Sequence, residues 1–429
     1  MKGGRGEPMG GPEAENFFTS RSLVTDPYPY YDELRQRCPV QREPHHEVMM
    51  ITGYEEALAV YRDSERFSSC TAVTGPFPGF PVPLDGDDVS DLIERCRDDL
   101  PFSDQLPTFD PPRHTLHRGL LMGLLTPRRL KENEDSMRRL AERQLEEVLA
   151  DGRCEFVRDY AGPFAMLVVA DLLGVPEEDH DDFRRSLGQT KGFGSTGGDV
   201  LAHTPLDFLY DRFTAYVEDR RSAPRDDVLT KLAQATYRDG TVPDVQGVVR
   251  LAANLFAAGQ ETTVRLLASA VQMIAEDAEL QERLRQHRDE IPDFIEETLR
   301  FESPVKGDFR LARVPVTVGD VDIPAGTTVM LLNGAANRDP RKFDSPAEFR
   351  PHRRNAREHL AFGQGVHFCP GAPLARAEGR ITVNQLLDRM RGISVSEEEH
   401  GPPGARRFRY FPTYILRGIQ RLHIEFGAA

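Results

Sequence analysis

The fold of this chain depends on one stretch, His359-Leu-Ala-Phe362-Gly363-Gln-Gly365-Val-His367-Phe-Cys369-Pro370-Gly371, which leads directly into a helical pattern from Ala372 to Met390. Free backbone N–H groups and the positive end of the dipole at a helix start favour a thiolate there. Pro370 suits the first helical position, because its missing N–H would have no helical partner. The glycines allow the backbone to lie close to a large flat group. We interpret the stretch as a preformed thiolate ligand, and haem iron is one cofactor that such a ligand serves.

Composition excludes several classes of protein. The 429 residues carry a formal net charge of −15, which argues against nucleic acid and anionic membranes as partners. No apolar run approaches the roughly 18 residues of a membrane span, and we expect no signal peptide. The five cysteines are odd in number and scattered, which suits a reduced protein. We therefore expect a cytoplasmic protein with no membrane span and no nucleic-acid partner.

A long apolar-periodic helix is predicted from Gly240-Thr-Val-Pro243-Asp244 to about Glu276. Its middle contains Phe256-Ala-Ala258-Gly259-Gln-Glu261-Thr262-Thr263. A glycine inside a helix costs about 1 kcal/mol relative to alanine, and threonine is a poor helix former. This locally unfavourable patch indicates either a functional groove or a close helix crossing.

Two charged pairs stand at helical spacing. His114 and Arg118 are four residues apart, and Glu297 and Arg300 are three apart, so each pair shares a helix face. The spacing alone does not distinguish an ordinary surface pair from a functional pair in either case.

Taken together, these motifs resemble the cytochrome P-450 family. Phe-Gly-x-Gly-x-His-x-Cys-x-Gly at 362–371, followed by Ala-Pro-Leu-Ala-Arg-x-Glu at 372–378, is similar to the family's haem-binding loop. The helix patch at 256–263 is similar to its oxygen-binding groove. The resemblance implies a mainly α fold with small β-sheets (α+β), in which a long central helix lies over haem b and a loop carries the cysteine ligand.

The resemblance also implies roles for individual residues. Cys369 would ligate the iron, and Glu261 and Thr262 would deliver protons to dioxygen. Glu297, Arg300 and a downstream arginine, Arg353, would form a structural ion-pair network. The other cofactor-binding residues would be the propionate partners His114, Arg118, Arg310 and His367, the loop residues Phe362, Gly363 and Gly371, and the groove residues Ala258 and Gly259.

A mostly apolar substrate pocket is expected near the long segment from Thr71 to Pro107, which lacks a regular pattern. An ordinary surface loop is the alternative there. Lys306 and Asp308 could add polar selectivity. The predicted lining residues are Phe77, Phe80, Leu255, Ala258, Val305, Phe309 and Tyr414.

The chain is expected to hold a mobile N-terminal tail (1–20) and one large domain (21–429). Strands are predicted around Val40–Arg42 and Val48–Thr52, and a closing hairpin over 410–416 and 421–426. Gly192-Phe-Gly194-Ser-Thr-Gly197 matches a dinucleotide-binding fingerprint, which we reject because a helical pattern and not a strand precedes it.

By resemblance, the protein is a haem-thiolate monooxygenase that inserts one oxygen atom from O2 into a C–H bond of a small, largely apolar substrate. A peroxide-driven peroxygenase and a non-catalytic haem sensor are the alternatives, and the pair Glu261 and Thr262 favours dioxygen. Electrons would come from a ferredoxin or flavodoxin with its reductase. Six basic residues against three acidic ones between Arg341 and Leu360 suit such an acidic partner, although a merely solvated face explains them equally. We expect a monomer.

Overall fold

The structure is a computed structural model that describes residues 15–187 and 204–429, and it is about 53% helical. This confirms the predicted fold class, mainly α with small sheets. The rejected fingerprint at 192–197 lies outside the described residues. In chain order the helices are α1 (Ser22–Thr25), α2 (Tyr28–Arg37), α3 (Tyr54–Arg62), α4 (Ser90–Cys96), α5 (Arg113–Leu124), α6 (Pro127–Leu149), α7 (Gly162–Leu173), α8 (His180–Leu187), α9 (Thr204–Ser222), α10 (Val228–Ala233), α11 (Val245–Glu276), α12 (Ala278–Gln286), α13 (Ile291–Phe301), α14 (Asn333–Ala336), α15 (Ala372–Arg389) and α16 (Glu397–His400).

The strands form one sheet of five strands, one of three and one of two. Their orders are β1-β2-β8-β5-β3, β4-β10-β9 and β6-β7. In the largest sheet β2 and β8 are parallel and the other neighbours are antiparallel. The strands are β1 (Val40–Arg42), β2 (Met49–Ile51), β3 (Phe67–Ser68), β4 (Arg153–Glu155), β5 (Asp308–Ala312), β6 (Val316–Val318), β7 (Val321–Ile323), β8 (Thr328–Leu331), β9 (Met390–Val395) and β10 (His423–Ala428).

The two N-terminal strands are confirmed, but the predicted hairpin at the C-terminus is wrong. Strand β10 pairs with β9 and β4 instead of with residues 410–416. That segment forms only the isolated bridges Val305↔Leu416 and Tyr410↔Ile419. Its apolar side chains therefore pack against other elements, and its backbone does not form a strand pair with residues 421–426.

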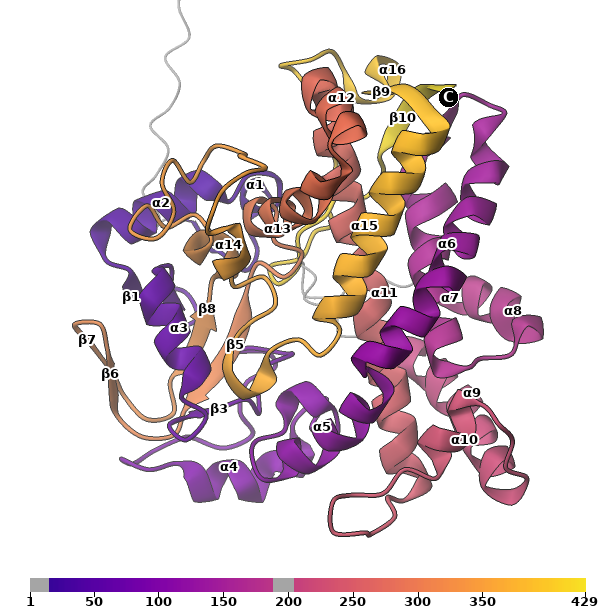
Figure 1. Cartoon of the computed structure of the whole chain (residues 1–429). Coiled ribbons are helices and arrows are strands. Elements are labelled where there is room, and N and C mark those ends of the chain that lie inside the picture. Colours follow the sequence, from indigo (N-terminus) through magenta and orange to yellow (C-terminus); the bar gives the residue numbers. More distant parts are fainter. Residues whose placement is uncertain (1–14, 188–203) are drawn as a thin grey trace, which may run out of the picture.

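Helix α11 is the central element of the helix-rich part of the molecule (Figure 1). Asp244 caps its start, because the Oδ1 atom accepts a hydrogen bond of 2.6 Å from the N–H of Gly247. The helix packs against α7, α9 and α15, and most of its apolar residues are buried there. Its predicted bounds, from Asp244 to Glu276, are confirmed.

A separate aromatic cluster closes the N-terminal side of the molecule. Phe17 and Phe18 are each 2% exposed, and they pack with Tyr30, Tyr31 and Tyr414. The body of the chain therefore includes these residues, and the predicted end of the tail at residue 20 is wrong. Residues 1–14 lie outside the described part. Among the described helices, none is both long and apolar enough to cross a membrane.

Asp110 connects the segment before α5 to the largest sheet. Its buried carboxylate accepts hydrogen bonds from the Ser68 hydroxyl (2.5 Å), the Ser69 N–H (2.7 Å), Arg97 (2.7 Å) and Arg313 (2.7 Å). Two guanidinium groups, one residue of β3 and the residue that follows it thus depend on one side chain, which fixes where α5 begins.

We expect Asp110→Asn to lower the free energy of unfolding by about 3–5 kcal/mol, because Arg97 and Arg313 lose the buried carboxylate that they share and keep only the more exposed Glu94. Urea unfolding followed by circular dichroism measures this loss. The matched control is Glu132→Gln, which breaks an exposed pair with Arg128 and should change little. Equal effects of the two substitutions would contradict the role of Asp110.

Candidate active site

The cysteine loop is held against α3 by backbone contacts. The N–H of Cys369 donates a hydrogen bond of 2.9 Å to the carbonyl of Phe362, which closes the loop around the short turn Gly365–His367. Gly363 and Gly365 both have positive φ, at 63° and 71°. A Cβ atom on Gly365 would overlap the carbonyl oxygen of Tyr61. Glycine is therefore required at residue 365 by both conformation and space.

Cys369 lies just before α15, which begins at Ala372 with Gly371 as its N-cap. The predicted place of Pro370 as the first helical residue is wrong, because the turn around Gly371 delays the helix. Burial raises the pKa of the Cys369 thiol, and the N–H groups of Gly371 and Ala372 and the charge of Arg118 oppose that rise. Full ionisation of this thiol therefore needs a further positive charge at the sulfur, such as a metal cation.

Four groups that can carry positive charge gather near the same loop. The rings of His114 and His367 lie 4.0 Å apart, and Nη2 of Arg118 donates to the carbonyl of Phe368 at 2.5 Å. Arg310 is buried and contacts Asp308 at 3.2 Å. Residues from α5, β5 and the cysteine loop thus meet in one place, although they are far apart in the sequence.

The histidines of this cluster are neutral for electrostatic reasons. Burial, then Arg310, His114 and Arg118, lower the pKa of His367 to about 2. Burial and Arg118 lower the pKa of His114 to about 4. Both ring nitrogens of His114 are buried and have no hydrogen-bond partner. The cluster therefore has unused donors and excess positive charge, which suits an anionic group.

The middle of α11 carries the small and polar residues of the predicted oxygen-binding groove. Ala258 is exposed, Thr262 is half-buried, and the Thr262 hydroxyl donates to the Ala258 carbonyl at 2.8 Å. Glu261 forms an ion pair with the buried Arg265. A Cβ atom on Gly259 would lie 2.9 Å from Val169 of α7, so this glycine serves the packing of two helices. This packing role is separate from the predicted place of Gly259 beside the cofactor, which stays a prediction.

A buried ion-pair network lies between α13 and the segment that precedes the cysteine loop. Arg300 donates to both oxygens of Glu297 at 2.7 Å, and Nε of Arg353 donates to the same oxygens at 3.1 Å. Arg300 also binds the carbonyls of Asn337 and Pro346. The structure thus brings the predicted trio together.

Comparisons with known proteins agree with this arrangement. The cytochrome P450 family profile matches residues 202–403. Cytochrome P450 144 of Mycobacterium tuberculosis is 32% identical over 423 residues, which cover 96% of this chain and 91% of the relative. The chain belongs to the cytochrome P450 family. The substrate-free structure of cytochrome P450 CYP150A6 from Mycobacterium marinum is 54% identical and has a TM-score of 0.92, with 97% and 99% of the two chains covered. The 6-deoxyerythronolide B hydroxylase of Saccharopolyspora erythraea is 30% identical over 95% of this chain and 97% of its own.

The predicted family, cytochrome P450 fold and enzyme class are therefore confirmed: this P450 is a monooxygenase, and its family binds haem through a cysteine thiolate. The residues present fit that cofactor. The half-buried thiol of Cys369 offers one soft ligand, and His114, whose ring nitrogens have no partner, lies in a cationic cluster that suits the two carboxylates of haem b. Within the described residues, no three His, Cys, Asp or Glu side chains gather as a zinc site would require.

A second network beside the loop was missed by the sequence analysis. Glu296 accepts hydrogen bonds from His359 (3.2 Å) and Arg376 (2.6 Å), and Arg376 lies over the ring of Phe362 at 4.7 Å. Burial raises the pKa of Glu296, but these two partners bring it down to about 2. Arg376 belongs to the motif that follows the cysteine. Its partner Glu296 is 80 residues away in the sequence, so helical spacing could not predict the pair.

Most of the predicted pocket-lining residues pack into apolar cores in the structure. Phe309 is fully buried on the sheet face opposite Arg310, because neighbouring strand residues alternate. There Phe309, Phe77 and Tyr414 pack in the aromatic cluster with Phe18. Of the other predicted lining residues, Phe80 packs against a small core with Val89, Leu255 lies in the main core, and Val305 is half-buried beside Leu416. Ala258 is exposed on α11 beside Thr262, and its predicted place in the lining stays a prediction.

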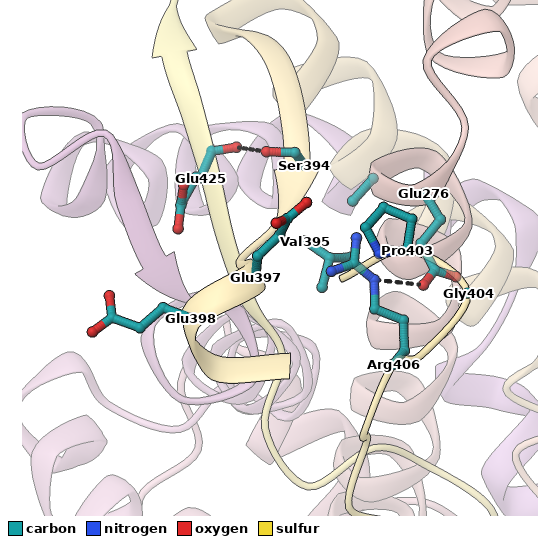
Figure 2. Close-up of a pocket in the computed structure, with 10 residues that line it drawn as sticks. Glu276, Ser394, Val395, Glu397, Glu398, Pro403, Gly404, Arg406 and Glu425 are labelled. Atoms are coloured by element: carbon teal, nitrogen blue, oxygen red, sulfur yellow. Dashed lines mark hydrogen bonds and ion pairs between the residues drawn. The ribbon is translucent and has the colours of Figure 1, made fainter. Parts of the chain in front are cut away.

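A surface groove with a volume of about 980 Å³ lies away from this site, between the end of α11, β9, β10 and α16 (Figure 2). It is lined by several carboxylates, and Arg406 pairs with Glu276 at 3.4 Å. Glu276 is 14 residues beyond Thr262 on one helix, or about 21 Å along the axis. The groove therefore does not belong to the chemistry around Cys369.

We expect Gly365→Ala to reduce the amount of haem that the purified protein retains, because the added methyl group would displace the loop that carries Cys369. The strain of a positive φ contributes about 1 kcal/mol, and the overlap with Tyr61 adds to it. The haem-to-protein ratio and the unfolding midpoint measure the effect. Gly404→Ala is the matched control, since Gly404 also has a positive φ (78°) but open space around it. Full haem retention in Gly365→Ala would contradict the argument.

Proposed function

We propose that Cys369 ligates the iron of haem b and that this P450 inserts one oxygen atom from O2 into a C–H bond of a small, largely apolar organic substrate. The observation that carries this proposal is the meeting of one half-buried thiol with a cationic cluster in which both nitrogens of His114 lack a partner. In the proposal, His114, Arg118, Arg310 and His367 bind the haem carboxylates, and Phe362, Gly363 and Gly371 shape the loop beneath the ring.

Bound haem supplies the activation of dioxygen, and the chain supplies ligand, protons and shape. The single hydroxyl hydrogen of Thr262 points to the Ala258 carbonyl, so its lone pairs are free to accept from a water molecule. Glu261 is the nearest acid on α11 and acts as the proton source for that water, while Arg265 holds its carboxylate. The network of Glu297, Arg300 and Arg353 holds the preceding segment in place.

The similarity to a 6-deoxyerythronolide B hydroxylase supports hydroxylation of a small organic molecule. The acid and alcohol on α11 favour dioxygen over peroxide as the oxidant, since a peroxide-driven enzyme does not need them. The same pair argues against a sensor without turnover.

The absorption spectrum of the reduced protein with carbon monoxide tests the central claim. We expect a strongly red-shifted Soret band in the wild type and its loss in Cys369→Ala, because only a thiolate ligand produces the shift. Cys154→Ala is the control, since Cys154 is a buried thiol in β4. A red-shifted band that persists in Cys369→Ala would show that another residue is the ligand.

Bacterial P450s take electrons from redox partners, and we propose an acidic ferredoxin or flavodoxin that docks near Arg354 and Arg357. Most of the six basic residues predicted for this surface are engaged internally. Arg341 pairs with Asp339 and Glu56, and Arg353 is buried against Glu297. Arg354 and Arg357 are exposed, and Arg357 pairs only at the surface with Asp293. The proposed docking surface is therefore smaller than the sequence suggested.

We expect the double charge reversal of Arg354 and Arg357 to glutamate to slow reduction by a ferredoxin about tenfold at low salt, and we expect the difference to shrink as salt screens the charges. Stopped-flow reduction under carbon monoxide measures the rate. Arg128→Glu, an exposed reversal on α6, is the control. Unchanged rates in the double variant would place the docking site elsewhere.

A further inference from the structure

Arg265 is a buried cation on the α11 face that carries Ala258 and Thr262 of the proposed oxygen-binding groove. Ala258, Thr262 and Arg265 are spaced i, i+4, i+7, so they share one face of the helix. Ala258 is exposed, whereas Arg265 is only 1% exposed because the C-terminal segment covers it. Its guanidinium lies 4.5 Å from the centre of the Phe411 ring.

The hydrogen-bonding capacity of Arg265 is largely unused. Its Nη2 atom donates to Glu261. The Nε and Nη1 atoms are buried and have no hydrogen-bond partner. Burial lowers the pKa of this guanidinium, which nevertheless stays charged. Two N–H donor atoms of this buried cation, Nε and Nη1, are therefore available to an acceptor.

Lys306 is a second buried cation that reaches the same region. It is 3% exposed, and its backbone N–H binds the carbonyl of Ile415 at 2.8 Å, which fixes it to the same C-terminal segment. Within the described residues its ammonium has no hydrogen bond and no ion pair. Burial, and then the charges of Arg417 and Arg265, lower its pKa to about 7.

The carboxylates nearby do not balance these charges. Glu302 is the acid whose charge reaches Lys306, but it forms ion pairs with Arg417 and with Arg338 at 3.6 Å. Glu261 is engaged by Arg265. Four cations therefore share two carboxylates, and buried charges of one sign are costly unless a counterion joins them.

We propose that Lys306 and Arg265 form an anion-binding subsite for a carboxylate of the substrate. This inference rests on the proposed function, which it deepens by naming a substrate class: an organic acid with an apolar body. Arg265 is three residues beyond Thr262 and seven beyond Ala258, or about 5 and 10 Å along the helix. If the carboxylate were held there, the substrate carbons that reach the oxidising centre would be several bonds away from it. The carbon next to the carboxylate would not reach that centre.

The test compares an acid with its neutral ester in the ferric holoprotein. Decanoic acid and methyl decanoate are the probes, and the substrate-induced shift of the Soret band and isothermal titration calorimetry give two independent dissociation constants. We expect Lys306→Met to weaken binding of the acid at least tenfold and to leave the ester unchanged. Lys342→Met is the matched control, because Lys342 pairs with Glu358 outside the cation cluster.

Two outcomes would overturn the subsite: equal affinity of wild type for acid and ester, or equal loss of both in Lys306→Met. Acetate and phosphate are tested as competitors. An inhibition constant of either anion equal to the dissociation constant of decanoic acid would show a site for free small anions, and it would also overturn the substrate role. The carbon monoxide spectrum of the same samples separates this failure from that of the proposed function. Methionine fills a similar apolar volume without a charge, so the variant should fold.

Discussion

The balance of buried charge at the cysteine is the constraint on which the rest of the site depends. Burial disfavours the thiolate of Cys369, and two backbone N–H groups and Arg118 compensate only in part. On the other side of the loop, both ring nitrogens of the buried His114 lack a hydrogen-bond partner, and the charges of Arg118 and Arg310 lie close by. A cofactor that brings a metal cation to the sulfur and carboxylates to the histidines resolves both imbalances at once.

Such a site has to be rigid before the cofactor arrives, and the structure shows how the chain achieves this. The loop is fixed from below by the contact of Gly365 with the Tyr61 backbone and by the hydrogen bond from the Leu360 N–H to Asn337 at 2.6 Å. Two ion-pair networks, centred on Glu296 and Glu297, connect α13 to the loop and to α15. Neighbouring residues of one helix thus serve two different supports, because they point about 100° apart.

The sequence was most informative where function or fold depends on local spacing. The bounds of α11 follow from its periodicity and from the Asp244 cap, and His114 and Arg118 share a face because they are four residues apart. It was uninformative where partners are distant. Whether Phe309 faces a pocket depends on the pairing of β5 with β8, and Gly259 is explained only by Val169 of another helix. The strand at 423–428 found its partner at 390–395, which no turn signal near the C-terminus could reveal.

In the proposed function, the pairing of Glu261 with Arg265 would connect proton delivery to the proposed substrate subsite. An arginine has five N–H donors in a planar fork, and Glu261 uses the Nη2 group while Nε and Nη1 stay free. An anion on these two atoms would therefore not displace Glu261. It would still weaken the hold of the guanidinium on the acid, because the added negative charge offsets part of the positive field. In the proposed function, Arg265 would hold this acid in place in the empty enzyme, and a bound charged substrate would release it to exchange protons.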